Sequence, residues 1–229
     1  MERFEVGATG QVALRHDAAG FGAFAVTNIA GNGRIRRRDG SVRDLYDFAH
    51  GAKTLSENAL SLGVVAQYGP FRFYSAGDFF CQPRMPDGHI RDFEAELAKE
   101  LDPVDVAKVN HHGHHAMSLS LVAALRARVW TACVWDRLHM TADTLERLAS
   151  RAAYPGPRLI APGVFPPVRR FEDAGRIFCR DIAPESFEAG HVVLTVAPGG
   201  ETYTVAYVTA DDESMTVTGA YDFTSRGAV

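Results

Sequence analysis

The chain has 229 residues, of which 46% are hydrophobic and 23% are charged, and this is the composition of a globular protein with a substantial core. Its formal net charge of −4 gives no electrostatic reason to expect a nucleic-acid-binding protein. Its three widely spaced cysteines (Cys81, Cys133 and Cys179) argue against a disulfide framework and a cysteine-rich zinc site. No signal peptide or membrane-spanning segment is visible, so we expect a cytoplasmic protein.

Two segments bounded by glycines open the chain. Gln11 to His16 and Phe21 to Ile29 have the pattern of extended strands, and Gly31-Asn32-Gly33 is a strong turn signal after them. The arginine-rich run from Arg34 to Gly40 follows. We interpret it as a solvated basic loop; contact with substrate phosphates is the alternative, which only the charge favours.

The clearest strand pair extends from Ala59 to Gly77. An apolar segment from Ala59 to Tyr68 is followed by Gly69-Pro70, and the aromatic segment from Phe71 to Tyr74 resumes the strand pattern. Apolar residues occupy both alternations of these strands. We therefore expect both faces of their sheet to be covered, as in a layered sandwich of strands and helices.

Strands and helices alternate between residues 90 and 151. The apolar stripe of Phe93, Leu97 and Leu101 predicts a helix from about Ile90 to Leu101. After it, the sequence predicts a strand, a helix capped by Ser118, a second strand and a third helix, over Val104 to Val109, Ser118 to Leu125, Val129 to Trp135, and Thr141 to Arg151. This alternation is typical of the α/β part of a fold.

A different pattern follows Tyr154. His191 to Ala197 and Thr202 to Thr209, joined by Pro198-Gly199-Gly200, predict an antiparallel hairpin, and Met215 to Phe223 predicts one more strand. No linker divides the chain. We expect a single domain over residues 1–229, with a C-terminal β-hairpin region at 190–223.

One carboxylate stands where folds of this kind place ligands. In Ser75-Ala76-Gly77-Asp78 an aromatic strand leads into glycine and then aspartate, at the sheet edge where α/β folds bind their ligands. A turn or helix-capping aspartate is the structural alternative, and Gly-Asp taken alone favours that alternative.

A histidine-rich loop is the strongest chemical signal. The segment Val109-Asn110-His111-His112-Gly113-His114-His115 places four histidines around a glycine, directly after a predicted buried strand. Imidazole is the commonest protein ligand for zinc at neutral pH. A solvated polar loop is the alternative, but such loops have less demanding residues available, so we predict a metal site.

Together, the Gly-Asp turn and the His-His-Gly loop resemble the last two metal motifs of the metallo-β-lactamase superfamily. Their order and spacing are similar to those of the branch that includes the hydrolase domain of bacterial DNA-uptake channel proteins. The segment from Ser56 to Leu62, which opens the hairpin, and His139, shortly after the next strand, also resemble that branch. The similarity covers about residues 56–151, and the tail from Gly190 resembles the closing strands of related bacterial proteins.

The resemblance implies a fold and roles for individual residues. The fold would be α+β, a four-layer αβ/βα sandwich, of which this chain would form the C-terminal half. Asp78 would bridge two metal ions, and one of His111 and His112 would be the terminal imidazole ligand. His111 is favoured because it follows the strand most directly. His139 would orient the substrate or protonate a leaving group, with a helix-start histidine as the alternative.

Four further residues receive weaker interpretations. His114 and His115 stand where small or hydroxyl residues usually follow the His-His-Gly of that branch. They are interpreted as neighbours of the metal ligands or as exposed side chains. Asn58 and Ser61 are interpreted as residues that shape the strand.

The first metal motif of the superfamily, His-x-His-x-Asp-His, is absent. None of the nine histidines has that spacing, and a hydrolytic zinc ion needs about three protein ligands. Three explanations are open: a fragment of a longer protein, a shortened relative that has lost catalysis, or a partner chain that supplies the other half. The fragment is favoured because the retained half keeps its chemistry.

The activity implied for the complete protein is metal-dependent hydrolysis. Hydroxide held between two zinc ions, with manganese or iron as alternatives, would attack a phosphodiester, lactam or similar ester. The chain as given is expected to be weakly active or inactive, and a non-catalytic binding or scaffold protein is the competing hypothesis. Half of a sandwich leaves sheet surface uncovered, which predicts self-association through an apolar face.

Overall fold

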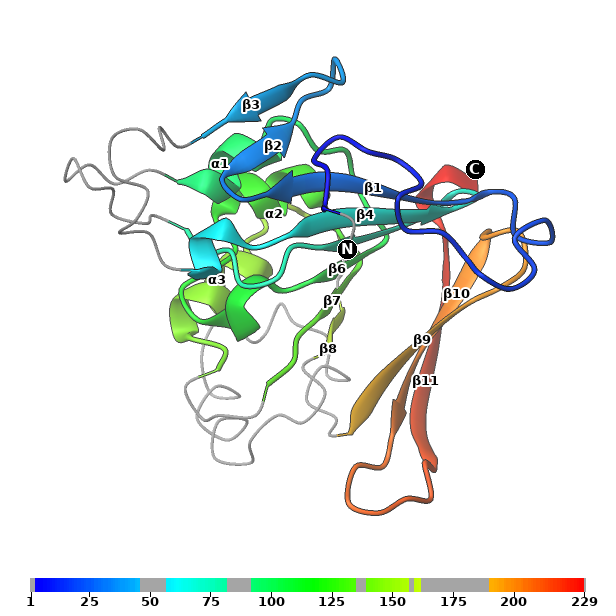
Figure 1. Ribbon diagram of the computed structural model, residues 1–229. Helices are drawn as coiled ribbons and strands as arrows, with labels where there is room; N and C mark the ends of the chain where they lie inside the picture. Colours follow the sequence, from blue (N-terminus) through cyan, green and yellow to red (C-terminus); the bar gives the residue numbers. More distant parts are fainter. Residues whose placement is uncertain are drawn as a thin grey trace.

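The computed structural model describes residues 3–45, 57–81, 92–134, 139–156, 159–161 and 190–228. These residues form a mixed α+β architecture, with one large sheet, a smaller sheet and a few short helices (Figure 1). No helix in this part of the chain has the length and apolar character needed to cross a membrane. Ser56, Ile90, Trp135 and Cys179, which the sequence analysis names, lie outside the described residues.

The large sheet combines an antiparallel and a parallel half. Its described strands lie in the order β3-β2-β1-β4-β5-β6-β7-β8. Neighbours from β3 to β5 are antiparallel, and neighbours from β5 to β8 are parallel. The carboxyl ends of β5, β6 and β7 therefore meet at one edge. In chain order the strands are β1 (Phe24–Gly31), β2 (Arg34–Arg36), β3 (Val42–Asp44), β4 (Gly63–Tyr68), β5 (Phe71–Ser75), β6 (Val106–Lys108), β7 (Val129–Thr131) and β8 (Leu159–Ala161).

Three short helices cover one face of the large sheet: α1 (Phe93–Ala98), α2 (Leu119–Leu125) and α3 (Ala142–Ala149). Their apolar residues share one buried cluster with Ala107 of β6 and Trp130 of β7. The preceding residues, Val106 and Val129, belong to a second cluster on the opposite face. Successive residues of a strand point to opposite faces, so these three-residue strands serve two cores at once.

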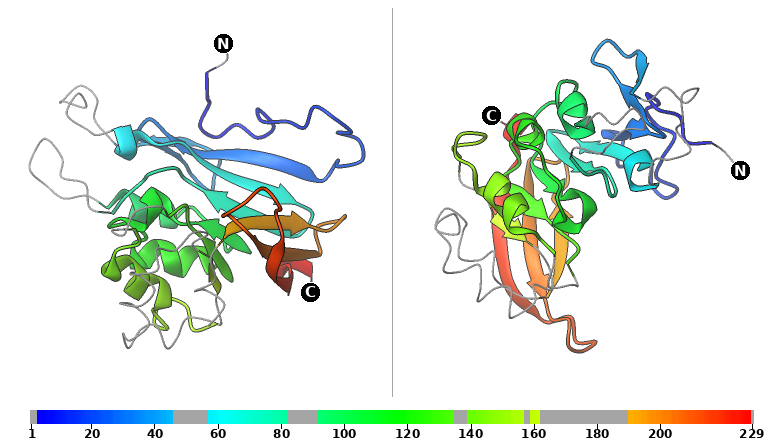
Figure 2. Two further views of the ribbon diagram at one scale, coloured as in Figure 1. Left: turned by 90° about the horizontal axis from the view of Figure 1, so that it is seen from below. Right: turned by 90° about the vertical axis from the view of Figure 1, so that its left-hand side faces the viewer.

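The small sheet covers that opposite face. It consists of β9 (His191–Val196), β10 (Thr202–Val208) and β11 (Val217–Thr224) in the order β11-β10-β9. Tyr203 and Val205 of β10 pack into the second cluster. Helices, large sheet and small sheet thus form three layers (Figure 2).

The outward face of the small sheet is rich in threonine. On β10 the residues that alternate with the buried ones are Thr202, Thr204 and Ala206, and the exposed residues of β9 include Thr195. Thr204 also bonds to Asp222 of β11 across the ladder, at 2.6 Å. In the described residues this face is therefore largely polar or small, although Val193 is 39% exposed. Self-association through an apolar face stays a prediction.

Most of the predicted elements are confirmed, with shorter bounds. Both hairpins form, β11 adds the predicted last strand, and Ser118 caps α2 by accepting a bond from Leu121 N. The predicted strand from Gln11 to His16 is wrong. Those residues are largely exposed, and it is the preceding segment that bonds to β1, through Gly7 N to Asn28 O and Gly10 N to Val26 O.

The prediction that the run from Arg34 to Gly40 is a loop is also wrong in part, because its first three residues form β2. Ile35 of β2 is 1% exposed and belongs to the core on the helix side. Burial of this one apolar side chain explains why the strand forms within a basic run.

Candidate metal centre

Asp78 and the histidine loop lie at the same edge of the large sheet. Asp78 follows β5, the loop follows β6, and the two strands are parallel neighbours. Oδ1 of Asp78 lies 3.6 Å from Nε2 of His112, and both side chains are partly exposed. The structure thus brings together two of the predicted site residues from positions far apart in the sequence.

The backbone fixes the orientation of the His112 ring. Nδ1 of His112 lies 2.9 Å from the carbonyl oxygen of Cys133, which follows β7. A carbonyl oxygen only accepts hydrogen bonds, so Nδ1 carries the proton and donates it. In the neutral ring the lone pair is then on Nε2, the atom that faces Asp78.

His111 has a different environment. Its Nδ1 lies 2.8 Å from the carbonyl oxygen of His114 and its Nε2 lies 3.0 Å from the side-chain nitrogen of Asn58. His111 therefore donates from Nδ1 and accepts at Nε2. Its ring also contacts Phe80, with ring centroids 5.5 Å apart. Protein groups engage both of its nitrogens.

The turn Glu57–Leu60 and the residue after it contact both the histidine loop and the turn that carries Asp78. Asn58 holds His111, as described above, and Oγ of Ser61 accepts a bond from Asp78 N at 3.0 Å. These two residues were expected only to shape the strand, whereas the structure places each against a candidate site residue.

Lys108 bonds to both the turn that carries Asp78 and the residue before the histidine loop. Its ammonium group donates to the carbonyl oxygens of Gly77, at 2.9 Å, and Val109, at 3.1 Å. Burial lowers the pKa of Lys108, while the negative charge of Asp78 opposes that shift. Gly77 has a φ of 55°, so the turn that carries Asp78 uses the left-handed region that glycine enters most easily.

His139, His114 and His115 differ in how they lie relative to His112. The ring of His139 stacks on that of His112, with centroids 5.1 Å apart. The His114 ring lies 6.4 Å from His139, and burial lowers the pKa of His114, an effect reinforced by the neighbouring His115 and His111. His115 is 64% exposed on its side chain and pairs with Asp143 at 3.2 Å. His139 is thus next to the pair, whereas His115 points to a separate surface carboxylate.

The loop has a strongly constrained backbone. His111, His112, His115 and Met117 all have φ between 47° and 61°, the left-handed region that side chains rarely adopt. Gly113, with a φ of 78°, lies directly against Met140, so a side chain there would clash. The path of the loop therefore depends on contacts that outweigh this backbone strain.

Glu94 provides such contacts and was missed by sequence analysis. It is 1% exposed and accepts hydrogen bonds from Asn110 Nδ2 at 2.8 Å, Met117 N at 3.1 Å and Ser118 N at 2.5 Å. A signal was present in the sequence: Glu94 follows Phe93 and precedes Leu97 by three residues, which puts a carboxylate on the apolar side of the predicted helix.

Two protein ligands are fewer than a hydrolytic metal site uses. Among the described residues, no group of three His, Cys, Asp or Glu side chains lies close enough together to hold a metal ion. Two histidines of the chain, His50 and His89, lie outside the described residues. In the described part of the chain, the Asp78–His112 pair therefore lacks the third side chain that such a site needs.

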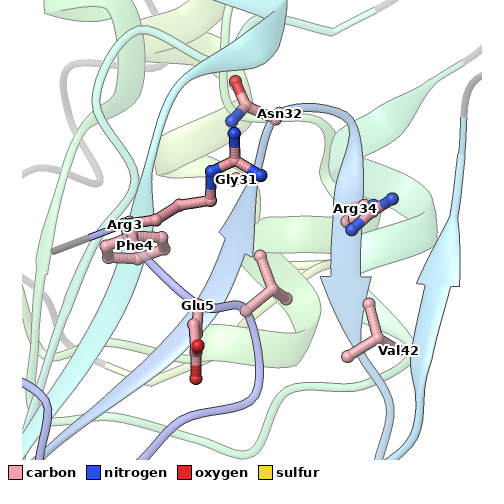
Figure 3. A pocket seen from close by; sticks show the side chains of 8 residues that line it. Arg3, Phe4, Glu5, Gly31, Asn32, Arg34 and Val42 are labelled. Carbon is pink, nitrogen blue, oxygen red and sulfur yellow. The ribbon is translucent and has the colours of Figure 1, made fainter. Parts of the chain in front are cut away.

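A cavity of about 820 Å³ lies between the N-terminal segment and the β1–β3 strands, and neither Asp78 nor His112 is among its lining residues (Figure 3). It is lined by Arg3, Phe4, Glu5, Val6, Gly31, Asn32, Arg34 and Val42. Arg34 already pairs with Asp44 at 2.7 Å. Histidine and cysteine are absent from the described lining, which does not suit a transition-metal site.

Three of the four arginines in the basic run pair with carboxylates. Arg34 pairs with Asp44, Arg38 with Asp102 at 2.6 Å, and Arg37 with Asp39 at 3.8 Å. Such pairing leaves less positive charge for a phosphate backbone than the sequence suggests.

Comparison of the sequence with protein-family models and with curated proteins finds no match.

Proposed function

We propose that the chain is part of a metal-dependent hydrolase of the metallo-β-lactamase type, in which Asp78 and His112 bind a metal ion. The observation that carries the proposal is the 3.6 Å between Oδ1 of Asp78 and Nε2 of His112. Two ligands at about 2.0–2.2 Å from one tetrahedral zinc ion are roughly 3.4 Å apart. The residues present therefore fit one zinc ion, with manganese or iron as alternatives.

His112 is proposed as the imidazole ligand in preference to His111. A metal-bound histidine commonly donates its other ring N–H to a backbone carbonyl, which fixes the tautomer. His112 makes such a bond to Cys133 O while its Nε2 faces Asp78. His111 has Asn58 at its Nε2, so this atom would first have to lose that partner.

The other residues have supporting roles in the proposal. Ser61 and Lys108 hold the Asp78 turn, and a bound ion would supply Lewis-acid chemistry and an acidic water molecule. His139, stacked on His112, is the residue proposed to contact the substrate and donate a proton to the leaving group. The bond class is a phosphodiester or a similar ester.

The fold proposal is that the three layers belong to a four-layer αβ/βα sandwich. The order helices, large sheet, small sheet supports it. With two protein ligands, this chain is expected to bind metal weakly and to hydrolyse substrate slowly or not at all.

A non-catalytic binding or scaffold protein is the second candidate. The observation that favours it is the lack of a third ligand near Asp78 and His112 among the described residues. In that case substitution of the two residues would change neither metal content nor any activity.

Zinc titration of the purified, metal-free chain tests the proposal, using calorimetry together with hydrolysis of bis(p-nitrophenyl) phosphate. We expect measurable zinc binding that is at least about tenfold weaker in Asp78→Asn. Asp143→Asn is the matched control, because Asp143 also pairs with a histidine, His115, at 3.2 Å. Absence of zinc binding in the unmodified chain, or equal affinity in the two variants, would reject the proposal.

A further inference from the structure

Glu94 is a buried acid whose hydrogen-bond partners, among the described residues, lie at the two ends of the histidine loop. Its carboxylate accepts bonds from Asn110, at the start of the histidine loop, and from Met117 and Ser118, at its end. Met117 lies in the buried core, and Ser118 also caps α2. One side chain thus joins the two ends of the loop to α1.

The loop between these two ends needs such a connection. His111, His112, His115 and Met117 are left-handed, and none of them is glycine. Left-handed backbone is disfavoured for residues with a Cβ, so the loop tends to relax to another path unless its ends are held. A buried side chain that accepts from three N–H donors is a direct means of holding them, because these donors would lose their partners if the loop took another path.

A second contact extends the network toward the sheet. Asn110 Nδ2 also donates to Oη of Tyr74, at 3.2 Å, and Tyr74 is a fully buried residue of β5. The path from Glu94 through Asn110 to Tyr74 therefore connects α1 and the start of the His loop to the strand that leads to Asp78.

We propose that Glu94 is a positioning residue, which clamps both ends of the histidine loop and so keeps His112 facing Asp78. The effect of this clamp on metal binding rests on the proposed function. The clamp itself concerns the metal-free chain and stands independently of it.

Glu94→Gln tests the clamp at nearly constant volume. The amide replaces one accepting oxygen with an NH2 group, which then faces an N–H donor of the loop. Glu96→Gln is the matched control: Glu96 lies in the same helix, is partly exposed, and pairs with Lys99 and Arg43. Amide hydrogen exchange of Met117 and Ser118 is measured by NMR in the metal-free protein, and zinc affinity is measured by calorimetry.

In Glu94→Gln we expect exchange of the Met117 and Ser118 amides to be at least tenfold faster than in Glu96→Gln, while the amides of β4 and β5 keep their protection. Zinc affinity is expected to fall at least tenfold in the same variant. If Glu94→Gln does not fold, Glu94→Asp decides, because it keeps the carboxylate but withdraws it from the donors. The clamp would be overturned by one result. This is that the Met117 and Ser118 amides of Glu94→Gln, or of Glu94→Asp if only that variant folds, exchange no faster than those of Glu96→Gln.

The two proposals fail in different ways. Faster exchange of the two amides in a chain that binds no zinc would keep the clamp and reject the metal site. Zinc binding that is lost in Asp78→Asn but unchanged in Glu94→Gln, with unchanged exchange, would keep the metal site and reject the clamp.

Discussion

Gly200 lies so close to the carbonyl oxygen of Tyr68 that a side chain at this position would overlap that oxygen. The contact joins the turn between β9 and β10 to the turn between β4 and β5. Gly199 N adds a hydrogen bond to Oη of Tyr68, at 3.1 Å. The small sheet is therefore attached to the large one through backbone contact as well as through its apolar face.

This contact predicts an unequal effect of two neighbouring substitutions. Gly200→Ala is expected to lower the free energy of unfolding by about 3 kcal/mol, from steric overlap added to left-handed strain. Gly199 has the same kind of φ, 87°, but a Cβ added there would meet no atom within 4 Å, so Gly199→Ala is expected to lower the free energy of unfolding by only about 1 kcal/mol. Urea unfolding measures both, and equal losses would show that the close contact is absent in solution.

The two adjacent imidazoles are expected to differ as zinc ligands. His112→Asn removes the ring nitrogen that faces Asp78 and should weaken zinc binding at least about tenfold. His111→Asn should have a smaller effect, through the loop alone, and His115→Asn should have none because His115 pairs with Asp143. Calorimetric titration of the three variants ranks them, and a larger loss for His111→Asn would reverse the assignment.

Glu94 predicts a pH dependence of stability. Burial raises its pKa to about 7 from an ordinary 4.5, so the folded state holds this proton more tightly than the unfolded state. The contribution of the group to stability is therefore greatest below the unfolded pKa, declines as the pH rises from 4.5 to 7, and is constant above that. The decline is about 1 to 3 kcal/mol.

The measurement compares the unmodified chain with Glu94→Gln, which has no titrating group at this position. Chemical unfolding at about pH 5 and about pH 8 gives the free energy of each protein, and the difference between them isolates Glu94. The free energy of unfolding of the unmodified chain, relative to that of the variant, should be lower at about pH 8 than at about pH 5. A constant or rising difference would contradict the raised pKa.

Arg38 is expected to stabilise the fold more than its neighbour in the basic run. Its guanidinium donates to the carbonyl oxygens of Lys99 and Leu101 just after α1, and to Asp102. Arg38→Ala should cost about 1 to 2 kcal/mol, discounted for the partial exposure of the side chain. Arg37→Ala, which loses only an exposed pair at 3.8 Å, should change stability by less than about 0.5 kcal/mol. Thermal unfolding measures both variants. Equal losses of stability would argue against the packing of the β2–β3 hairpin on the end of α1.

The features that sequence predicts well here are those with a local pattern. The Ala59–Gly77 hairpin and the C-terminal hairpin combine alternating apolar residues with glycine and proline turns, and both form as expected. Asp78 and the histidine loop were expected to belong to one site because of their resemblance to two metal motifs of one superfamily, and the parallel pairing of β5 with β6 places them at one edge.

The features that could not be predicted from the sequence depend on contacts between distant segments. Which imidazole faces Asp78 is decided by two successive left-handed residues, His111 and His112, and no periodicity encodes their φ values. The role of Glu94 depends on a loop sixteen or more positions away in the chain. Asn58 was assigned to strand geometry because its partner, His111, is 53 residues further along.

The two-sided burial of the short central strands affects the order in which the chain can fold during synthesis. Val106 and Val129 lie on the sheet face that residues 191–208 cover. Until those residues have emerged from the ribosome, this face is open while the helix-covered face can already pack. Nascent chains halted before residue 191 should therefore bind hydrophobic-surface chaperones more strongly than chains extended past residue 224.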